Sequence, residues 1–203
     1  MVTLELPDED TLYSLIADRR AKGLDKPDEV WDGRYIVMPN PGNEHQDILF
    51  ELSLAFGELI KRRGLGRVLP GCNVSDREDD WRQNYRCPDV AVFLNTNPAE
   101  DRGSHWLGGP DLAVEIISRG DRARQKLDFY AAVGVRELIL IERDPWVIDL
   151  FSRDDEALKQ VATATPGRGR LETNVVPLSW SLTLANGDRP RLHLEGAGQE
   201  WTA

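Results

Sequence analysis

Two acidic residues lie within strand-like apolar runs, where an unpaired charge is costly. Asp89 opens the run PDVAVFL and would share a strand face with Ala91 and Phe93. Glu115 lies inside the run DLAVEIIS, with apolar neighbours on both sides. A buried carboxylate without a partner is strongly destabilising or stays protonated. We therefore expect a charged partner for each acid, and a hard divalent cation is one candidate.

Each acid also has an ordinary structural explanation. A carboxylate at the start of a strand, such as Asp89 after Pro88, is often solvated or bonded to a loop amide. Glu115, deep in its strand, could form a structural salt bridge with an arginine or lysine. If the two strands are neighbours, however, the two carboxylates can converge on one point, and the pair then favours a shared site.

Lys126 is the third candidate, because it lies in a segment with helical spacing. It flanks the apolar stripe of Ala123, Leu127 and Tyr130, so its stem could follow the core while the ammonium reaches the two acids. The alternative is an ordinary surface lysine.

Glu44 is the fourth candidate, at the start of the longest predicted helix. It precedes Ile48 by four residues and could point toward the sheet as a further metal ligand or water-orienting group. An acid in the first turn of a helix also simply suits the helix dipole. His45 beside it could carry a proton, and Ser118 could cap a helix or touch the site.

Periodicity predicts three helices, over residues 11–22, 43–64 and 121–133. In the second, Asn43 and Gln46 are spaced as in a capping box, and Gly64 can end the helix. Its expected buried stripe is Ile48, Leu52, Ala55, Phe56 and Leu59.

Short apolar runs predict the strands. The dipeptide Asp32-Gly33 between β-rich runs indicates a two-residue hairpin. PDVAVFL, DLAVEII and RELILIER suit a sheet covered on both faces. WVIDLF and residues 158–162 suit an antiparallel pair, and residues from 171 onward could add edge strands.

These elements predict one α/β or α+β domain over residues 1–203, built around a mixed sheet that is flanked by helices. We expect a helical extension over 1–27, a core over 28–165 that contains the hairpin, and a β-rich tail over 166–203.

The candidate residues, in this order, resemble the PD-(D/E)XK nuclease superfamily. Pro88-Asp89 matches its PD and Glu115 its second acid. Within it, the chain is similar to a bacterial family of uncharacterised proteins labelled "putative restriction endonucleases". The matching segments span about residues 28–142 and are VWDGRYIVMP, EHQDILFELSLAF, CPDVAVF, GPDLAVEIIS and RQKLDFYAAVGVRELILIE. Ile117 stands where the superfamily lysine is expected, and the family resemblance moves that role to Lys126.

The resemblance implies a restriction-endonuclease-like core and a Mg²⁺-dependent endonuclease that hydrolyses phosphodiester bonds, with DNA as the expected substrate. Asp89 and Glu115 would bind Mg²⁺, for which Mn²⁺ could substitute, and Lys126 would orient a water or neutralise charge. Glu44 would complete the metal shell. A homodimer is also expected. The alternative is a nuclease-like fold that serves as a binding or assembly module without catalysis.

Composition places further bounds on function. With 25 Lys and Arg against 35 Asp and Glu, the net charge of −10 argues against strong metal-free binding of a polyanion. Basic clusters do occur: residues 61–67 hold four bases and no acid, and residues 119–126 hold four bases and one acid.

The sequence also bears on location. No apolar run approaches the about 20 residues that span a bilayer, and the acidic N-terminus does not resemble a signal peptide. Cys72 and Cys87 are expected to be reduced thiols. We therefore expect a cytoplasmic protein with no membrane partner.

Overall fold

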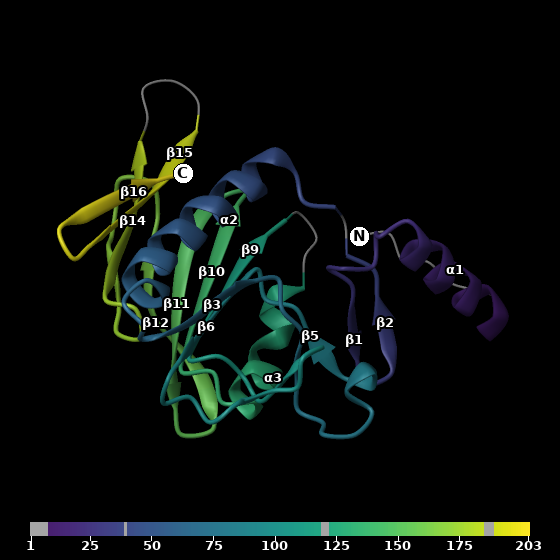
Figure 1. Cartoon of the computed structure of the whole chain (residues 1–203). Coiled ribbons are helices and arrows are strands. Elements are labelled where there is room, and N and C mark those ends of the chain that lie inside the picture. The colour runs from purple at the N-terminus through teal and green to yellow at the C-terminus, as the bar shows by residue number, and fades with distance from the viewer. Residues whose placement is uncertain (1–7, 39, 119–121, 185–188) are drawn as a thin grey trace.

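The computed structural model describes residues 8–38, 40–118, 122–184 and 189–203, and it contains three β-sheets (Figure 1). The helical elements are α1 (Glu9–Ala21), α2 (Asn43–Phe56), the π-helix η1 (Gly57–Lys61), the 3₁₀-helices η2 (Trp81–Gln83) and η3 (Ala123–Lys126), and α3 (Leu127–Ala132). The strands are β1 (Glu29–Trp31), β2 (Arg34–Ile36), β3 (Gly66–Pro70), β4 (Val74–Ser75), β5 (Tyr85–Arg86), β6 (Val90–Leu94), β7 (Glu100–Asp101), β8 (Trp106–Leu107), β9 (Leu112–Ile117), β10 (Glu137–Arg143), β11 (Trp146–Asp154), β12 (Ala157–Ala164), β13 (Leu171–Thr173), β14 (Leu178–Leu184), β15 (Pro190–Gly196) and β16 (Gln199–Thr202).

The central sheet has the order β12-β11-β10-β9-β6-β3 and is mixed, as predicted. β9 and β10 run parallel, whereas the other neighbouring strands run antiparallel. Helix α2 lies over one face of this sheet and α3 over the other (Figure 1). Because side chains alternate along a strand, Val114 and Ile116 face the α2 core whereas Ala113 faces the α3 core. Glu115 therefore points toward α3.

Helix α2 buries the apolar stripe that its sequence predicts, since Ile48, Leu52 and Phe56 are fully buried. The capping prediction was wrong: Gly42 is the N-cap residue, and Asn43 is already the first helical residue. The helix continues as η1, and Gly64 follows in the left-handed conformation at φ 68°, as the predicted helix end requires.

A second sheet, of order β2-β1-β5-β4-β8-β7, begins with the predicted hairpin. Asp32 and Gly33 both have positive φ angles, 48° and 79°, which is the conformation of a tight two-residue turn between twisted strands. β1 pairs with β2 on one side and with β5 on the other. The hairpin thereby aligns β1 beside the chain that leads into Asp89.

The predicted third helix is divided. Residues Ala123–Lys126 form the 3₁₀-helix η3 and Leu127–Ala132 form α3, while residue 121 lies outside the described residues. Gly134 ends the segment at φ 96°. The helix α1 agrees with its prediction to within two residues at each end.

The C-terminal segment corrects one expectation. Its strands form a separate antiparallel sheet, β13-β14-β15-β16, and do not extend the central sheet at its edge. The reason is its apolar alternation: Trp180, Leu192 and Leu194 lie on one face and are buried in the same core as α2. The Trp180 ring contacts the Phe56 ring, with centroids 5.9 Å apart.

Candidate active site

Asp89 and Glu115 come from neighbouring antiparallel strands, as the sequence reasoning required. Val90 on β6 pairs with Val114 on β9, so extending this register by one residue places Asp89 opposite Glu115. Opposite residues in an antiparallel pair have Cβ atoms about 5 Å apart and face the same side. The Asp89 carboxylate itself binds the backbone N of Ile116, next to Glu115, and its charge raises the pKa of the Glu115 carboxyl, so the two acids lie close together just before β6.

Asp89 joins three elements through its carboxylate. Its Oδ2 accepts a hydrogen bond of 2.6 Å from the backbone N of Ile116 on β9, and its Oδ1 lies 3.0 Å from Nε2 of His45 on α2. Its side chain is 23% exposed, whereas that of His45 is 9% exposed. Asp89 is thus held by the protein yet remains open to solvent.

Glu115 is held by Lys126 and Tyr130, both from the segment that covers this face of the sheet. Lys126 Nζ lies 2.9 Å from Oε1 and 3.0 Å from Oε2 of Glu115, and the Tyr130 hydroxyl donates to Oε1. Lys126 is only 1% exposed. The prediction that the lysine stem follows the core toward the acid agrees with this geometry.

Burial and nearby charge determine the electrostatics of the Glu115 carboxyl. Burial raises its pKa, the Lys126 ammonium opposes that rise, and the negative charges of Asp89 and Glu29 add to it. Burial also raises the pKa of the Tyr130 phenol well above its usual range, so this phenol is a proton donor at neutral pH. The site is therefore an acid-rich cluster with a buried ammonium inside it.

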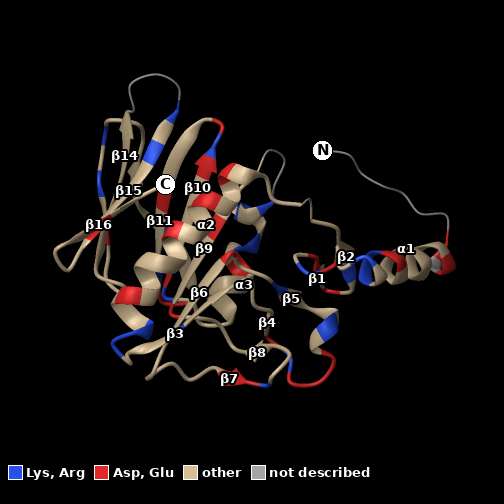
Figure 2. Ribbon diagram, turned by 45° about the horizontal axis from the view of Figure 1, so that its top comes forward, with Lys and Arg blue, Asp and Glu red and all other residues tan. Residues whose placement is uncertain are grey.

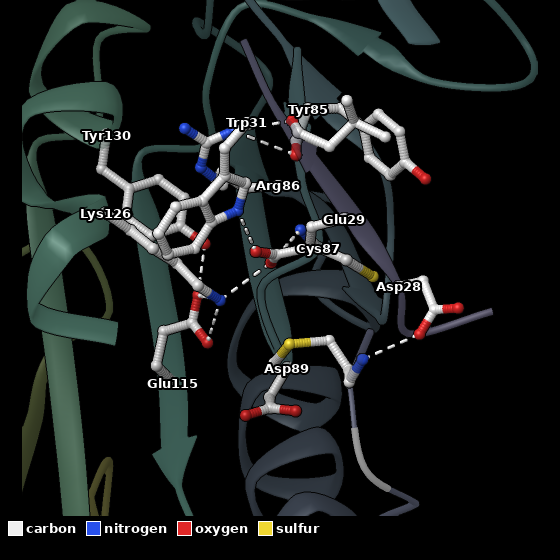
Figure 3. A network of polar contacts seen from close by, with 12 residues as sticks. Asp28, Glu29, Trp31, Tyr85, Arg86, Cys87, Asp89, Glu115, Lys126 and Tyr130 are labelled. Atoms are coloured by element: carbon white, nitrogen blue, oxygen red, sulfur yellow. Dashed lines mark hydrogen bonds and ion pairs between the residues drawn. The ribbon is translucent and has the colours of Figure 1, made fainter. Parts of the chain in front are cut away.

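Glu29 is a site residue that the sequence reasoning missed. Its Oε1 accepts a 2.8 Å hydrogen bond from Lys126 Nζ, so the ammonium lies between Glu29 and Glu115 (Figure 3). The sequence also did not predict that the Tyr130 hydroxyl takes part in the site, because the spacing of Tyr130 indicates a place in an apolar stripe. A signal for Glu29 did exist: it lies two residues before Trp31 in a β-rich run and therefore on the same strand face.

The structure places Glu44 in a group with two arginines, whereas the prediction has it complete a metal shell. Its carboxylate is bound by Arg143 at 3.0 Å and by Arg189 at 2.6 Å. Among the described contacts, no hydrogen bond or ion pair joins it to the two site acids or to the site lysine. Helix geometry explains the difference, because His45 rather than Glu44 is buried with the α2 stripe.

Ser118 accepts a 2.9 Å hydrogen bond from Arg143 Nη2 and thus lies with the Glu44 group. Two arginines of the basic clusters have acidic partners. Arg67 pairs with Asp101, and Arg124 pairs with acids on β10 and β11. Figure 2 shows basic and acidic residues interspersed over the ribbon. Residues 61–67 also follow the far end of the α2–η1 helix, about 25 Å from His45 at 1.5 Å per residue.

The carboxylate oxygens of Asp89 and Glu115 suit a hard cation that needs few ligands from the protein. Within the described part of the chain, no group of three or more His, Cys, Asp or Glu side chains is arranged to hold a metal. Two adjacent carboxylates nevertheless suit Mg²⁺, which keeps several of its waters in protein sites. Asp89 and Glu115 would hold it, and Glu115 would have to exchange a Lys126 hydrogen bond for the metal.

Two further expectations concern membrane-spanning helices and the state of the cysteines. None of the helices in the described residues is long and apolar enough to cross a membrane. Cys72 and Cys87 are free thiols, in agreement with the sequence reasoning.

Comparison with known proteins identifies a similar fold and the family of this chain. A solved structure titled as a putative nuclease belonging to DUF820, from Anabaena variabilis ATCC 29413, is 18% identical to this chain, with a TM-score of 0.60. The match covers 75% of this chain and 84% of that one, and it supports the fold. No functionally curated protein matches the chain. The Uma2 family model, described as "Putative restriction endonuclease", matches residues 20–185, so the resemblance is confirmed and the chain belongs to the Uma2 family.

Proposed function

We propose that this protein is a metal-dependent endonuclease that hydrolyses phosphodiester bonds of DNA. One observation carries the proposal: the carboxylate of Asp89, just before β6, accepts from the backbone N of Ile116, the residue after Glu115, and Lys126 donates to Glu115. Two carboxylates beside an ammonium provide both a cation site and a positive charge next to it. Membership of the Uma2 family supports the same reaction class.

The roles of the protein residues follow from their contacts. Asp89 and Glu115 would hold Mg²⁺ or Mn²⁺, which when bound polarises a phosphoryl oxygen and lowers the pKa of a bound water. Lys126, which is itself buried, would lend its positive charge to the site from beside Glu115 and so stabilise negative charge that develops nearby. Tyr130 and His45 orient the two carboxylates by hydrogen bonding to them. A homodimer remains part of this proposal, because a duplex presents two strands to be cut.

Cleavage of plasmid DNA tests the proposal. Supercoiled plasmid is incubated with Mg²⁺ or Mn²⁺ and either wild type or Asp89→Asn, a variant that keeps the size of the side chain. We expect nicked and linear products from wild type only, and none after chelation. Glu137→Gln is the control for the loss of a structural carboxylate charge, because Glu137 binds the backbone of residues 174 and 175 and not the site. Equal cleavage by Asp89→Asn, or none by wild type, would contradict the proposal.

One observation favours a second candidate, a nuclease-like binding module without catalysis. Both oxygens of Glu115 already accept hydrogen bonds from Lys126, so the cluster is internally satisfied without a metal. Calorimetric titration with Mn²⁺ separates the two candidates. Binding that Glu115→Gln abolishes supports the enzyme, whereas no binding by wild type supports the module.

A further inference from the structure

The buried ammonium of Lys126 has a second anionic partner from a different sheet. Nζ lies 2.8 Å from Oε1 of Glu29 on β1, on the side away from Glu115 (Figure 3). Glu29 is 0% exposed and Lys126 is 1% exposed. A buried ion pair of this kind needs further hydrogen bonds to offset the loss of hydration. The Glu29 carboxylate has them.

Glu29 is fixed by donors on both sides of its carboxylate. The indole Nε1 of Trp31 donates to Oε2 at 2.7 Å, and the backbone N of Cys87 donates to Oε1 at 2.8 Å. Trp31 belongs to the same strand as Glu29, and Cys87 directly follows β5, the neighbouring strand. The hairpin and the chain leading into Asp89 therefore hold this carboxylate in one place.

Glu115 and Glu29 differ in what they can do for the lysine. If Glu115 coordinates a metal, the metal competes with Lys126 for the carboxylate oxygens, which now accept two hydrogen bonds from Lys126. Glu29 has no such competing role, because its carboxylate is enclosed by Trp31, Cys87 and Lys126. Because Glu29 lies outside the metal site, it can hold the Lys126 ammonium in place when Glu115 moves to bind a metal.

We infer that Glu29 is a positioning residue that holds the Lys126 ammonium at the site while Glu115 binds a metal. This inference rests on the proposed function. The contrasting possibility is that Glu29 only stabilises the hairpin. The two differ in one respect: a positioning residue acts through Lys126, so its removal has no further effect once the lysine is gone.

A double-mutant cycle on the full chain tests this difference. Glu29→Gln should lower kcat about 10–100-fold, the usual effect of losing a residue that orients a site group. KM should stay nearly unchanged, because Glu29 is too deeply buried to touch the substrate. In the Lys126→Met background, Glu29→Gln should lower kcat no further. An equal further loss in that background, or an unchanged kcat in Glu29→Gln, would overturn the inference.

If Glu29→Gln folds poorly, two more variants separate a loss of stability from a loss of lysine positioning. Glu29→Asp keeps the charge and should retain more activity than Glu29→Gln. Glu137→Gln removes an equally buried acid away from the site and should lower the melting temperature with kcat unchanged. If Glu137→Gln and Glu29→Gln lower kcat alike, the effect of Glu29 is only structural.

A metal-free measurement separates failure of this inference from failure of the proposed function. Lysine-selective ¹⁵N NMR detects ammonium groups whose protons are protected from exchange, and Lys126→Met assigns the signal of Lys126. We expect this signal in wild type and Glu137→Gln, and its loss or a large shift in Glu29→Gln. An unchanged signal in Glu29→Gln overturns the positioning role even if wild type cleaves no nucleic acid.

Discussion

His45 Nε2 lies 3.0 Å from Oδ1 of Asp89, so the first turn of α2 reaches the carboxylate that directly precedes β6. The other oxygen of Asp89 accepts from the backbone N of Ile116. The carboxylate is therefore oriented from two directions before any ligand binds. Such preorganisation reduces the cost of assembling a cation site.

Replacement of His45 should impair the site without unfolding the protein. We expect His45→Ala to lower nuclease activity about 10–100-fold, because the Asp89 carboxylate loses one of its two orienting contacts. The measurement is the initial rate of plasmid cleavage together with Mn²⁺ affinity by calorimetry. Gln46→Ala, at the exposed neighbouring position, is the control. Wild-type rate and affinity in His45→Ala would show that the contact is incidental.

Loss of the Tyr130 hydroxyl should affect both stability and activity. Tyr130→Phe removes a buried donor from Glu115, and an unsatisfied buried acceptor usually costs about 1–3 kcal/mol. Urea unfolding measures this loss, and the cleavage assay measures the effect on the site. Tyr13→Phe at a position that is 65% exposed should change stability by less than about 0.5 kcal/mol. Equal stability of the two variants would contradict the role of the hydroxyl.

Two glycine substitutions should change stability in opposite directions. A Cβ at Gly66 would lie 2.2 Å from the carbonyl oxygen of Phe93, so Gly66→Ala should push β3 from β6 and destabilise by about 1–3 kcal/mol. Gly57 has helical dihedral angles and no atom within 4 Å of an added Cβ. Gly57→Ala should therefore stabilise by about 0.4–1 kcal/mol. Denaturant midpoints test both, and a tolerated Gly66→Ala would show that the two strands separate easily.

The His105 imidazole should make stability depend on pH. Burial, and secondarily the charge of Arg102, lowers its pKa below 6.5. The unfolded chain then binds more protons than the folded chain, so this contribution is complete above about pH 6.5 and is lost as pH falls through the folded pKa. Its ring stacks on Trp81 at 4.6 Å, so indole fluorescence and unfolding free energy should both change over that range. His105→Gln should remove the dependence.

The sequence predicted the parts of the site that short-range patterns encode. Alternation along β9 placed Glu115 on one face, and helical spacing brought Lys126 toward it. Glu29 escaped prediction because its partner Lys126 is 97 residues away in the chain and lies in η3, not in the sheet of Glu29. Pairing across such separations depends on tertiary packing, which a local pattern does not report.

Differences between prediction and structure have the same origin. The spacing of Glu44 to Ile48 fitted a residue facing the sheet, but Arg189 and Arg143 bind its carboxylate instead. The pattern of the tail from residue 171 allows edge strands, because alternation shows which face is apolar but not which surface that face covers. Its partner proved to be α2.

The contact between Trp180 and Phe56 has a consequence for synthesis of the chain. The helix that presents His45 packs into a core that includes residues up to Ala203, whose backbone pairs with Leu192. A nascent chain therefore lacks the covering layer of α2 until these residues have been translated. We therefore expect the packing that supports His45 to be completed only after residues 192–203 have been synthesised.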